Sequence, residues 1–126
     1  MVKRLDGVLL SSGNTKKLAE FYREVVGLKQ TVEFEMGEKG ESGYMFEEVQ
    51  LYINPHSEVK GKNKNPQRYM LNFEVDDIEK EFEKLKKKGA KVIQKIYHIE
   101  DYGQIATFED VDGNFFQLVQ VRPTSN

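Results

Sequence analysis

The sequence contains no cysteine, which excludes disulfides, thiolate nucleophiles and cysteine-ligated metals. No apolar run approaches the ~18 residues that a membrane-spanning helix needs, and the N-terminus lacks the apolar core of a signal peptide. Acidic and basic residues nearly balance, at 21 and 19, so no general field favours nucleic acid or an anionic membrane. These absences predict a cytoplasmic protein with neither a nucleic-acid nor a membrane partner.

The common catalytic signatures are also missing. The chain has no G-x-S-x-G nucleophile elbow, no Walker loop, no G-x-G-x-x-G phosphate loop and no H-E-x-x-H zinc motif. It has only two histidines, and a lone histidine is more often a surface or hydrogen-bonded residue than a metal ligand. The sequence therefore names no reaction by motif.

What is present is an internal repeat. Candidate helix caps Asn14 and Asp77 lie 63 residues apart, and the glycines that would end the two helices, Gly27 and Gly89, lie 62 apart. Each half has about 60 residues, which is marginal for independent folding, so the halves are expected to share a core or exchange partners with a second chain.

The alternation of apolar and polar residues gives the order of elements in each half, strand, helix and three strands. The expected strands cover 4–11, 28–36, 43–47 and 49–53 in the first half, and 69–75, 91–98, 104–109 and 115–121 in the second. The chain is thus predicted to be a single domain of two βαβββ modules, 4–54 and 68–121, joined by a connector, 55–67, and followed by a tail, 122–126.

In four of these strands one side is consistently apolar and is expected to pack against the two amphipathic helices. The opposite side mixes small, amide and large apolar residues, which suits the lining of a small-molecule pocket better than a bare solvent face. An ordinary half-exposed sheet surface is the competing interpretation.

Three segments carry a further signal: residues 18–28 (LAEFYREVVGL), residues 73–77 (FEVDD) and residues 108–118 (FEDVDGNFFQL). They resemble, in order, the FYxxxLG helix end, the second helix entry and the F-x-D-P-D-G-N-x-x-E-L ending of the vicinal oxygen chelate superfamily. This superfamily includes glyoxalase I, bleomycin-resistance proteins and extradiol dioxygenases. The resemblance implies an α+β fold in which the two repeats form a curved mixed sheet with the helices on its convex face.

In metal-using members of this superfamily, each repeat lends one ligand from its first strand and one from its last. Carried over by motif, the four positions are Gly7, Gln50, Met70 and Gln117, expected to face each other across the middle of the fold. A glycine, a thioether and two neutral amides should not hold a divalent cation, which needs several nitrogen or oxygen donors with charge compensation. No cofactor is therefore expected.

The leading hypothesis is a metal-free, bleomycin-resistance-like protein that binds a small organic molecule in the cup of the sheet. Its expected ligand-binding residues are Gly7, Leu9, Gln50, Tyr52, Met70, Asn72 and Gln117. Glycine at position 7 would leave room where the family places an imidazole. No catalytic residue is assigned.

Two alternatives stay open. The chain could be a metal-dependent lyase, isomerase or dioxygenase with unorthodox ligands such as Glu48, Glu74 and His98. It could instead be an interaction domain with no small-molecule role. A homodimer is expected in either case, because the shared cup of this superfamily is often completed across chains.

Overall fold

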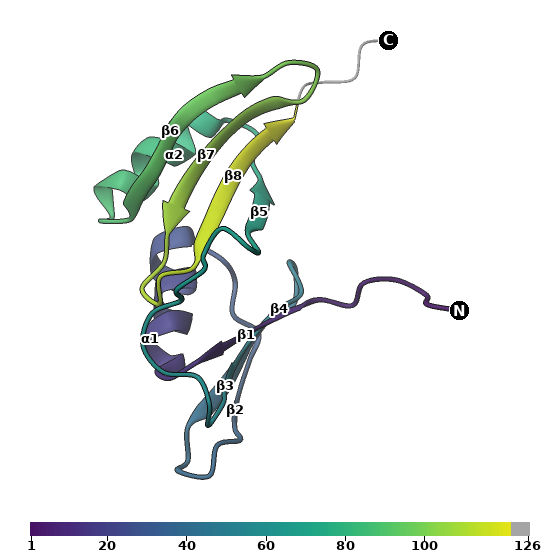
Figure 1. Cartoon of the computed structure of the whole chain (residues 1–126), viewed down its shortest axis with the longest axis vertical. Coiled ribbons are helices and arrows are strands. Elements are labelled where there is room, and N and C mark those ends of the chain that lie inside the picture. Colours follow the sequence, from purple (N-terminus) through teal and green to yellow (C-terminus); the bar gives the residue numbers. More distant parts are fainter. Residues whose placement is uncertain (122–126) are drawn as a thin grey trace. The chain divides into compact units, whose positions relative to one another are not determined.

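The computed structural model describes residues 1–121, so the expected tail, 122–126, lies outside the described residues. The chain divides into two compact units, Met1–Gly61 and Lys62–Asn126, and the boundary falls within the expected connector. Each unit contains one four-stranded mixed sheet and one helical segment (Figure 1). No helix among the described residues is long and apolar enough to cross a membrane.

The first unit contains β1 (Val8–Ser12), α1 (Thr15–Glu20), a π-helical continuation η1 (Phe21–Val26), β2 (Val32–Glu35), β3 (Ser42–Phe46) and β4 (Leu51–Pro55). Its strands lie in the order β1-β4-β3-β2, with β1 parallel to β4 and the other neighbours antiparallel. The second unit contains β5 (Leu71–Glu74), α2 (Ile78–Lys87), β6 (Lys91–Ile99), β7 (Gly103–Glu109) and β8 (Phe115–Val121). Its order, β5-β8-β7-β6, is the same with β5 parallel to β8, which confirms the βαβββ repeat.

Both helical segments begin at the expected caps. The Asn14 side chain accepts a hydrogen bond from the backbone N–H of Lys17, and Asp77 accepts one from Lys80, each at 3.2 Å. These bonds satisfy N–H groups that have no partner inside the helix. Gly27 ends η1 in the left-handed conformation, at φ 89°, which costs glycine little because it has no Cβ.

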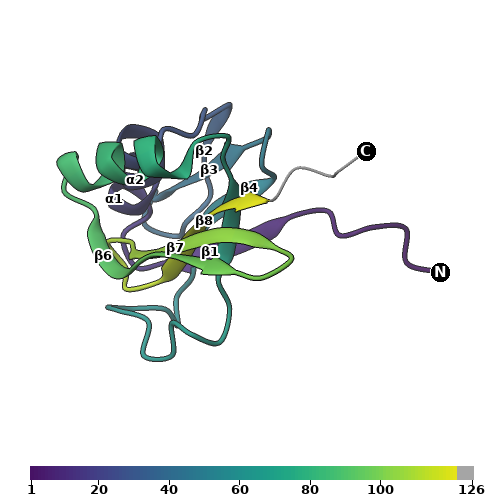
Figure 2. The ribbon, with the colours of Figure 1, turned by 90° about the horizontal axis from the view of Figure 1, so that it is seen from above.

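Each helix packs against one face of its own sheet. In the first unit, the buried pairs Leu51–Phe46 and Ile53–Tyr44 face α1. In the second, α2 lies along β6, β7 and β8 (Figure 2). There the ring of Phe108 lies 5.6 Å from that of Phe116 and 5.3 Å from that of Phe82, measured between ring centroids. This buried apolar area is the main favourable contribution to folding in each unit.

Some strands are shorter than expected. β2 covers only 32–35 of the expected 28–36, and β5 begins at Leu71, so Tyr69 is exposed. Val49, expected on the apolar side of a strand, lies exposed in a turn. The Gln50 N–H donates to the Glu47 carbonyl at 3.2 Å, and Gln50 has φ 52°, so extended structure starts only at Leu51.

The turn between β7 and β8 is held by a buried carboxylate. Asp110 Oδ1 accepts from the backbone N–H groups of Asp112 and Asn114, and its Oδ2 accepts from Asn114 Nδ2. The connector is tied to the same turn, because the Asn63 N–H donates to the Asp112 carbonyl at 2.8 Å and Asn63 Nδ2 donates to Asn114 Oδ1 at 3.0 Å. Asp110 thus fixes the turn to which the start of the second unit is attached.

We expect Asp110→Ala to lower the free energy of unfolding by about 2–3 kcal/mol, because it leaves part-buried backbone donors without an acceptor. Urea denaturation measures this loss. Asp112→Ala in the same turn is the control and should cost less than about 1 kcal/mol, since only its backbone takes part in these bonds. Equal losses in the two variants would contradict this role of Asp110.

Candidate functional site

The face of each sheet that lies opposite its helix, here called the open face, carries the expected ligand-binding positions. In the first sheet, strand pairing aligns four residues into an apolar row: Leu9, Tyr52, Met45 and Val32. In the second, it aligns four residues into a polar row: Asn72, Gln117, Thr107 and Gln94. The sequence predicted Leu9, Tyr52, Asn72 and Gln117 as site residues. The four it did not predict lie on the other two strands of each sheet: Met45 and Val32 on β3 and β2, and Thr107 and Gln94 on β7 and β6.

The two rows occupy equivalent positions in the repeat. Val8 pairs with Leu51 as Leu71 pairs with Phe116, so Tyr52 is the counterpart of Gln117. The sequence predicted Gln50 as the counterpart of Gln117, but the counterpart is Tyr52, two residues further along the chain. The cause is the turn before β4, which delays the start of that strand and cannot be seen in the alternation of residues.

Gly7 and Gln50 lie beside β1 and β4 rather than within them. A Cβ atom at Gly7 would lie 2.5 Å from both the Gln50 carbonyl oxygen and the Tyr52 ring, so the room expected at Gly7 is already filled. With its amide oriented to satisfy both neighbours, Gln50 donates to the Asp6 carbonyl and accepts from Arg4 Nη1. Both residues thus hold the segment that precedes β1 against the sheet.

The Tyr52 hydroxyl donates to Asp6 Oδ2 at 3.3 Å, and Asp6 is also 3.5 Å from Arg4 Nη2. Partial burial and the negative charge of Asp6 raise the pKa of the Tyr52 phenol above its ordinary value of 10.0. The phenol therefore stays neutral at physiological pH. It can donate a hydrogen bond but does not supply a phenolate.

In the second unit, Gln117 Nε2 donates to Thr107 Oγ1 at 2.9 Å, across the pairing of β8 with β7. Asn72 is exposed at the neighbouring register position on β5. Met70 precedes β5 and is 37% exposed, so it lies at the end of the strand rather than in the polar row.

The donor set does not fit a divalent metal ion. Gly7 has no side chain, the Gln50 amide binds neighbouring residues of its own unit, and the Gln117 amide is neutral. The rescuing ligands considered, Glu48, Glu74 and His98, are all exposed. Across residues 1–121, no three or more His, Asp or Glu side chains gather in a group that could hold an ion.

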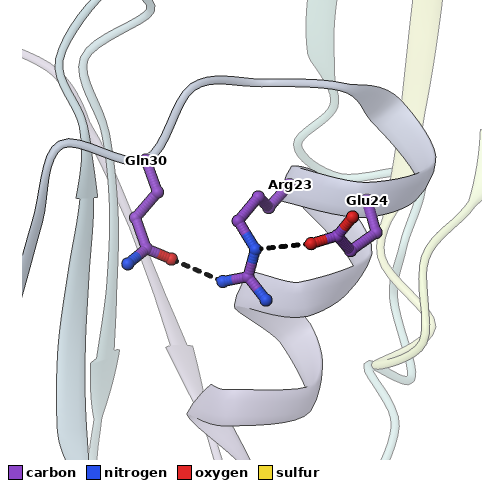
Figure 3. A network of polar contacts seen from close by, with 3 residues as sticks. All are labelled: Arg23, Glu24 and Gln30. Atoms are coloured by element: carbon purple, nitrogen blue, oxygen red, sulfur yellow. Dashed lines mark hydrogen bonds and ion pairs between the residues drawn. The ribbon is translucent and has the colours of Figure 1, made fainter.

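The first unit also has a hollow of about 850 Å³ that contains none of the expected site residues. It is bordered by the start of α1, the hairpin between β2 and β3, and residues 55–60. Arg23, on its wall, donates to Glu24 Oε1 at 2.8 Å and to Gln30 Oε1 at 2.7 Å (Figure 3). The hydrogen bond to Glu24 raises the pKa of the Arg23 guanidinium. This wall carries charged side chains, whereas the apolar and polar rows carry none.

Asn54 lies on the open face two residues after Tyr52. Its Oδ1 atom is buried without a hydrogen-bond partner, next to Gly43. A buried carbonyl oxygen normally has a donor, so this atom is an unused acceptor beside the apolar row.

Comparison with known proteins finds a sequence model of the Glyoxalase/Bleomycin resistance protein/Dioxygenase superfamily that matches residues 4–118. The uncharacterized protein YraH of Bacillus subtilis (strain 168) is 25% identical over 118 residues, covering 84% of this chain and 89% of YraH.

Two solved structures show the same fold. TnmS3, an antibiotic binding protein from Streptomyces sp. CB03234, has a TM-score of 0.67 at 20% identity, covering 96% of this chain and 98% of TnmS3. A mutant of FosX, the fosfomycin resistance protein of Listeria monocytogenes, complexed with Mn(II) and 1S,2S-dihydroxypropylphosphonic acid, has a TM-score of 0.73 at 14% identity, covering 97% and 93%. At these identities the likeness concerns the fold alone.

We expect Asn54→Val to raise the free energy of unfolding by about 1 kcal/mol, because it removes an unsatisfied acceptor and introduces a β-branched side chain. Asn72→Val is the matched control for strand preference, since the Asn72 amide is exposed to water. Thermal and urea unfolding compare the two. An Asn54→Val protein less stable than the parent would mean that Oδ1 has a stabilising partner.

The direction of the shift in the pKa of Tyr52 can be measured. The absorbance of tyrosinate, taken as the difference between the parent and Tyr52→Phe, should develop only above pH 10.0, and Asp6→Asn should shift that difference to lower pH. Because the phenol pKa is higher in the folded state, its contribution to stability is complete below 10.0 and is lost as the pH rises through the folded pKa. Ionisation of Tyr52 at or below 10.0 in the folded protein would contradict this assignment.

Proposed function

The chain belongs to the Glyoxalase/Bleomycin resistance protein/Dioxygenase superfamily, and on this premise we propose that it binds a small organic molecule on its open faces without a metal ion. One observation carries the proposal. The positions where metal-using relatives would place ligands carry no charged or imidazole donor, while both open faces keep exposed apolar and neutral polar side chains. Such a surface can bind an organic molecule, but it lacks the charge needed to hold a divalent cation.

The residues fall into two roles. Leu9, Tyr52 and Met70 supply apolar contact, and the 53% exposure of Leu9 leaves much of its side chain for a ligand to cover. Asn72 and Gln117 supply hydrogen bonds. Gly7 and Gln50 act indirectly, because they hold the segment before β1 against Tyr52.

The fold does not decide between binding and metal-dependent chemistry. TnmS3 is an antibiotic binding protein, and the FosX structure contains Mn(II), yet the chain resembles both to a similar degree. The choice therefore rests on the side chains, which support the binding role.

Assembly as a homodimer stays a prediction. Exposed apolar side chains on both open faces, such as Leu9, Val32 and Tyr97, are compatible with surfaces that a ligand or a second copy covers.

The test is a thermal-shift screen of the full chain against a library of aromatic and glycopeptide compounds, with each hit mapped by backbone and methyl NMR. A ligand that binds the folded state at about 100 times its Kd should add about 2.7 kcal/mol of stability. The expected hits perturb Leu9 and Tyr52 or Asn72 and Gln117. Tyr52→Ala should weaken them about tenfold or more, whereas Tyr69→Ala, at an 83% exposed tyrosine outside the strands, should not.

Two results would overturn the proposal. One is a library that yields no shift at any open-face residue. The other is a stoichiometric content of nickel, zinc, manganese or iron in protein purified without chelator, measured by elemental analysis, which would favour a metal-dependent enzyme.

A further inference from the structure

The polar row is continuous across the second sheet. Asn72 pairs with Gln117, Gln117 with Thr107, and Thr107 with Gln94, so one side chain from each of the four strands lies in line. With neighbouring strands ~4.8 Å apart, the row spans roughly 14 Å, the length of a small organic molecule. Every member carries an amide or a hydroxyl group, and none carries a charge.

The fold does not require these amides, since the first unit provides an internal comparison. The equivalent row there is Leu9, Tyr52, Met45 and Val32, on strands of the same order and direction. One backbone arrangement therefore supports an apolar row in one half and a polar row in the other. The difference lies in side-chain chemistry, as expected if the polar row recognises something.

A change in backbone register brings Gln94 into the row. Val92 pairs with Phe108, but Gln94 pairs with Thr107, so β6 contains an extra residue at this point. In a regular strand, Gln94 would share the helix-facing side of Val92, whereas the bulge turns it to the open face. The corresponding pairing of β2 with β3, from Val32 to Glu35, is regular. Bulges often re-aim a side chain next to a functional site.

The centre of the row is held in place. Thr107 is only 5% exposed, and its Oγ1 atom accepts from Gln117 Nε2 at 2.9 Å. This bond orients the Gln117 amide and leaves its Oε1 atom for a further donor. Two charged positions of the open face lie outside the row: Glu74 is exposed on β5, and Lys91 Nζ is 3.5 Å from Glu109 Oε2.

Resting on the function proposed above, we propose that the polar row recognises an uncharged hydroxyl- or amide-bearing edge of the ligand. Amides and hydroxyls both donate and accept, so they match the hydroxyls of a sugar or the amides of a peptide-like molecule. An ionised group laid on this row would lose water without gaining a counter-charge, which is unfavourable. The ligand class is therefore a neutral polyhydroxylated or amide-rich organic molecule.

Three probes that share the p-nitrophenyl glycoside scaffold and differ in the charge of one substituent test this. The p-nitrophenyl β-glucoside is neutral, the corresponding glucuronide carries a carboxylate, and the 2-amino-2-deoxy-glucoside carries an ammonium group. Each is titrated into the full chain, followed by the side-chain amide signals of Asn72, Gln94 and Gln117. The neutral glucoside should shift these signals and bind at least about tenfold more tightly than either charged probe.

Variants separate recognition from folding. Thr107→Val has nearly the same shape but lacks the hydroxyl, so it should weaken glucoside binding about five- to tenfold, while Thr107→Ser should retain it. Thr31→Val is the matched control, at an exposed threonine outside the row, and should leave binding unchanged. Equal thermal midpoints of Thr107→Val and Thr107→Ser would show that the valine variant is folded.

Binding of a charged probe as tightly as the glucoside would overturn the proposal. So would the absence of any shift in the three side-chain amide signals with every probe. These failures differ from failure of the proposed function. Compounds from the wider library could bind and shift the NMR signals of Leu9 and Tyr52 while the signals of the polar row do not move. In that case the protein still binds a ligand, but this row does not recognise it.

Discussion

The parallel pairing of the first strand of each repeat with its last strand is the constraint from which the rest of the structure follows. It joins β1 to β4 and β5 to β8, and the register of each pair decides which side chains share a face. A slip of one residue would exchange the buried and open faces of a strand. Burial of Leu51 and Ile53 against α1 therefore fixes the outward direction of Tyr52. The core specifies which side chains the open face carries even though it does not line that face.

Two halves with one topology have acquired opposite surface chemistries. The first carries Leu9, Tyr52, Met45 and Val32 where the second carries amides and a hydroxyl. Because helix-facing packing is maintained in both, the open faces are free to vary without loss of the fold. This freedom explains how one scaffold supports unrelated activities, and why function must be argued from the side chains rather than from the likeness of the fold.

Local signals predicted the parts of the structure that depend on neighbours in the chain. The caps Asn14 and Asp77, the stop at Gly27 and the strand 115–121 are where the sequence places them. What could not be predicted depends on distant pairing. The alternation of residues does not reveal the bulge that re-aims Gln94.

The same limit applies within the candidate site. The counterpart of Gln117 was misplaced because a turn delays the start of β4. Gly7 was expected to leave room, but the Tyr52 ring fills this space. That ring comes from a residue 45 positions further along the chain, which a local pattern does not reveal. The close approach at Gly7 also makes position 7 dependent on the residue at position 52. A side chain at position 7 needs the volume that the aromatic ring and the Gln50 carbonyl occupy, so glycine is required there while Tyr52 is kept. An imidazole or a carboxylate at position 7 would therefore need both a smaller side chain at position 52 and a shift of the Gln50 backbone.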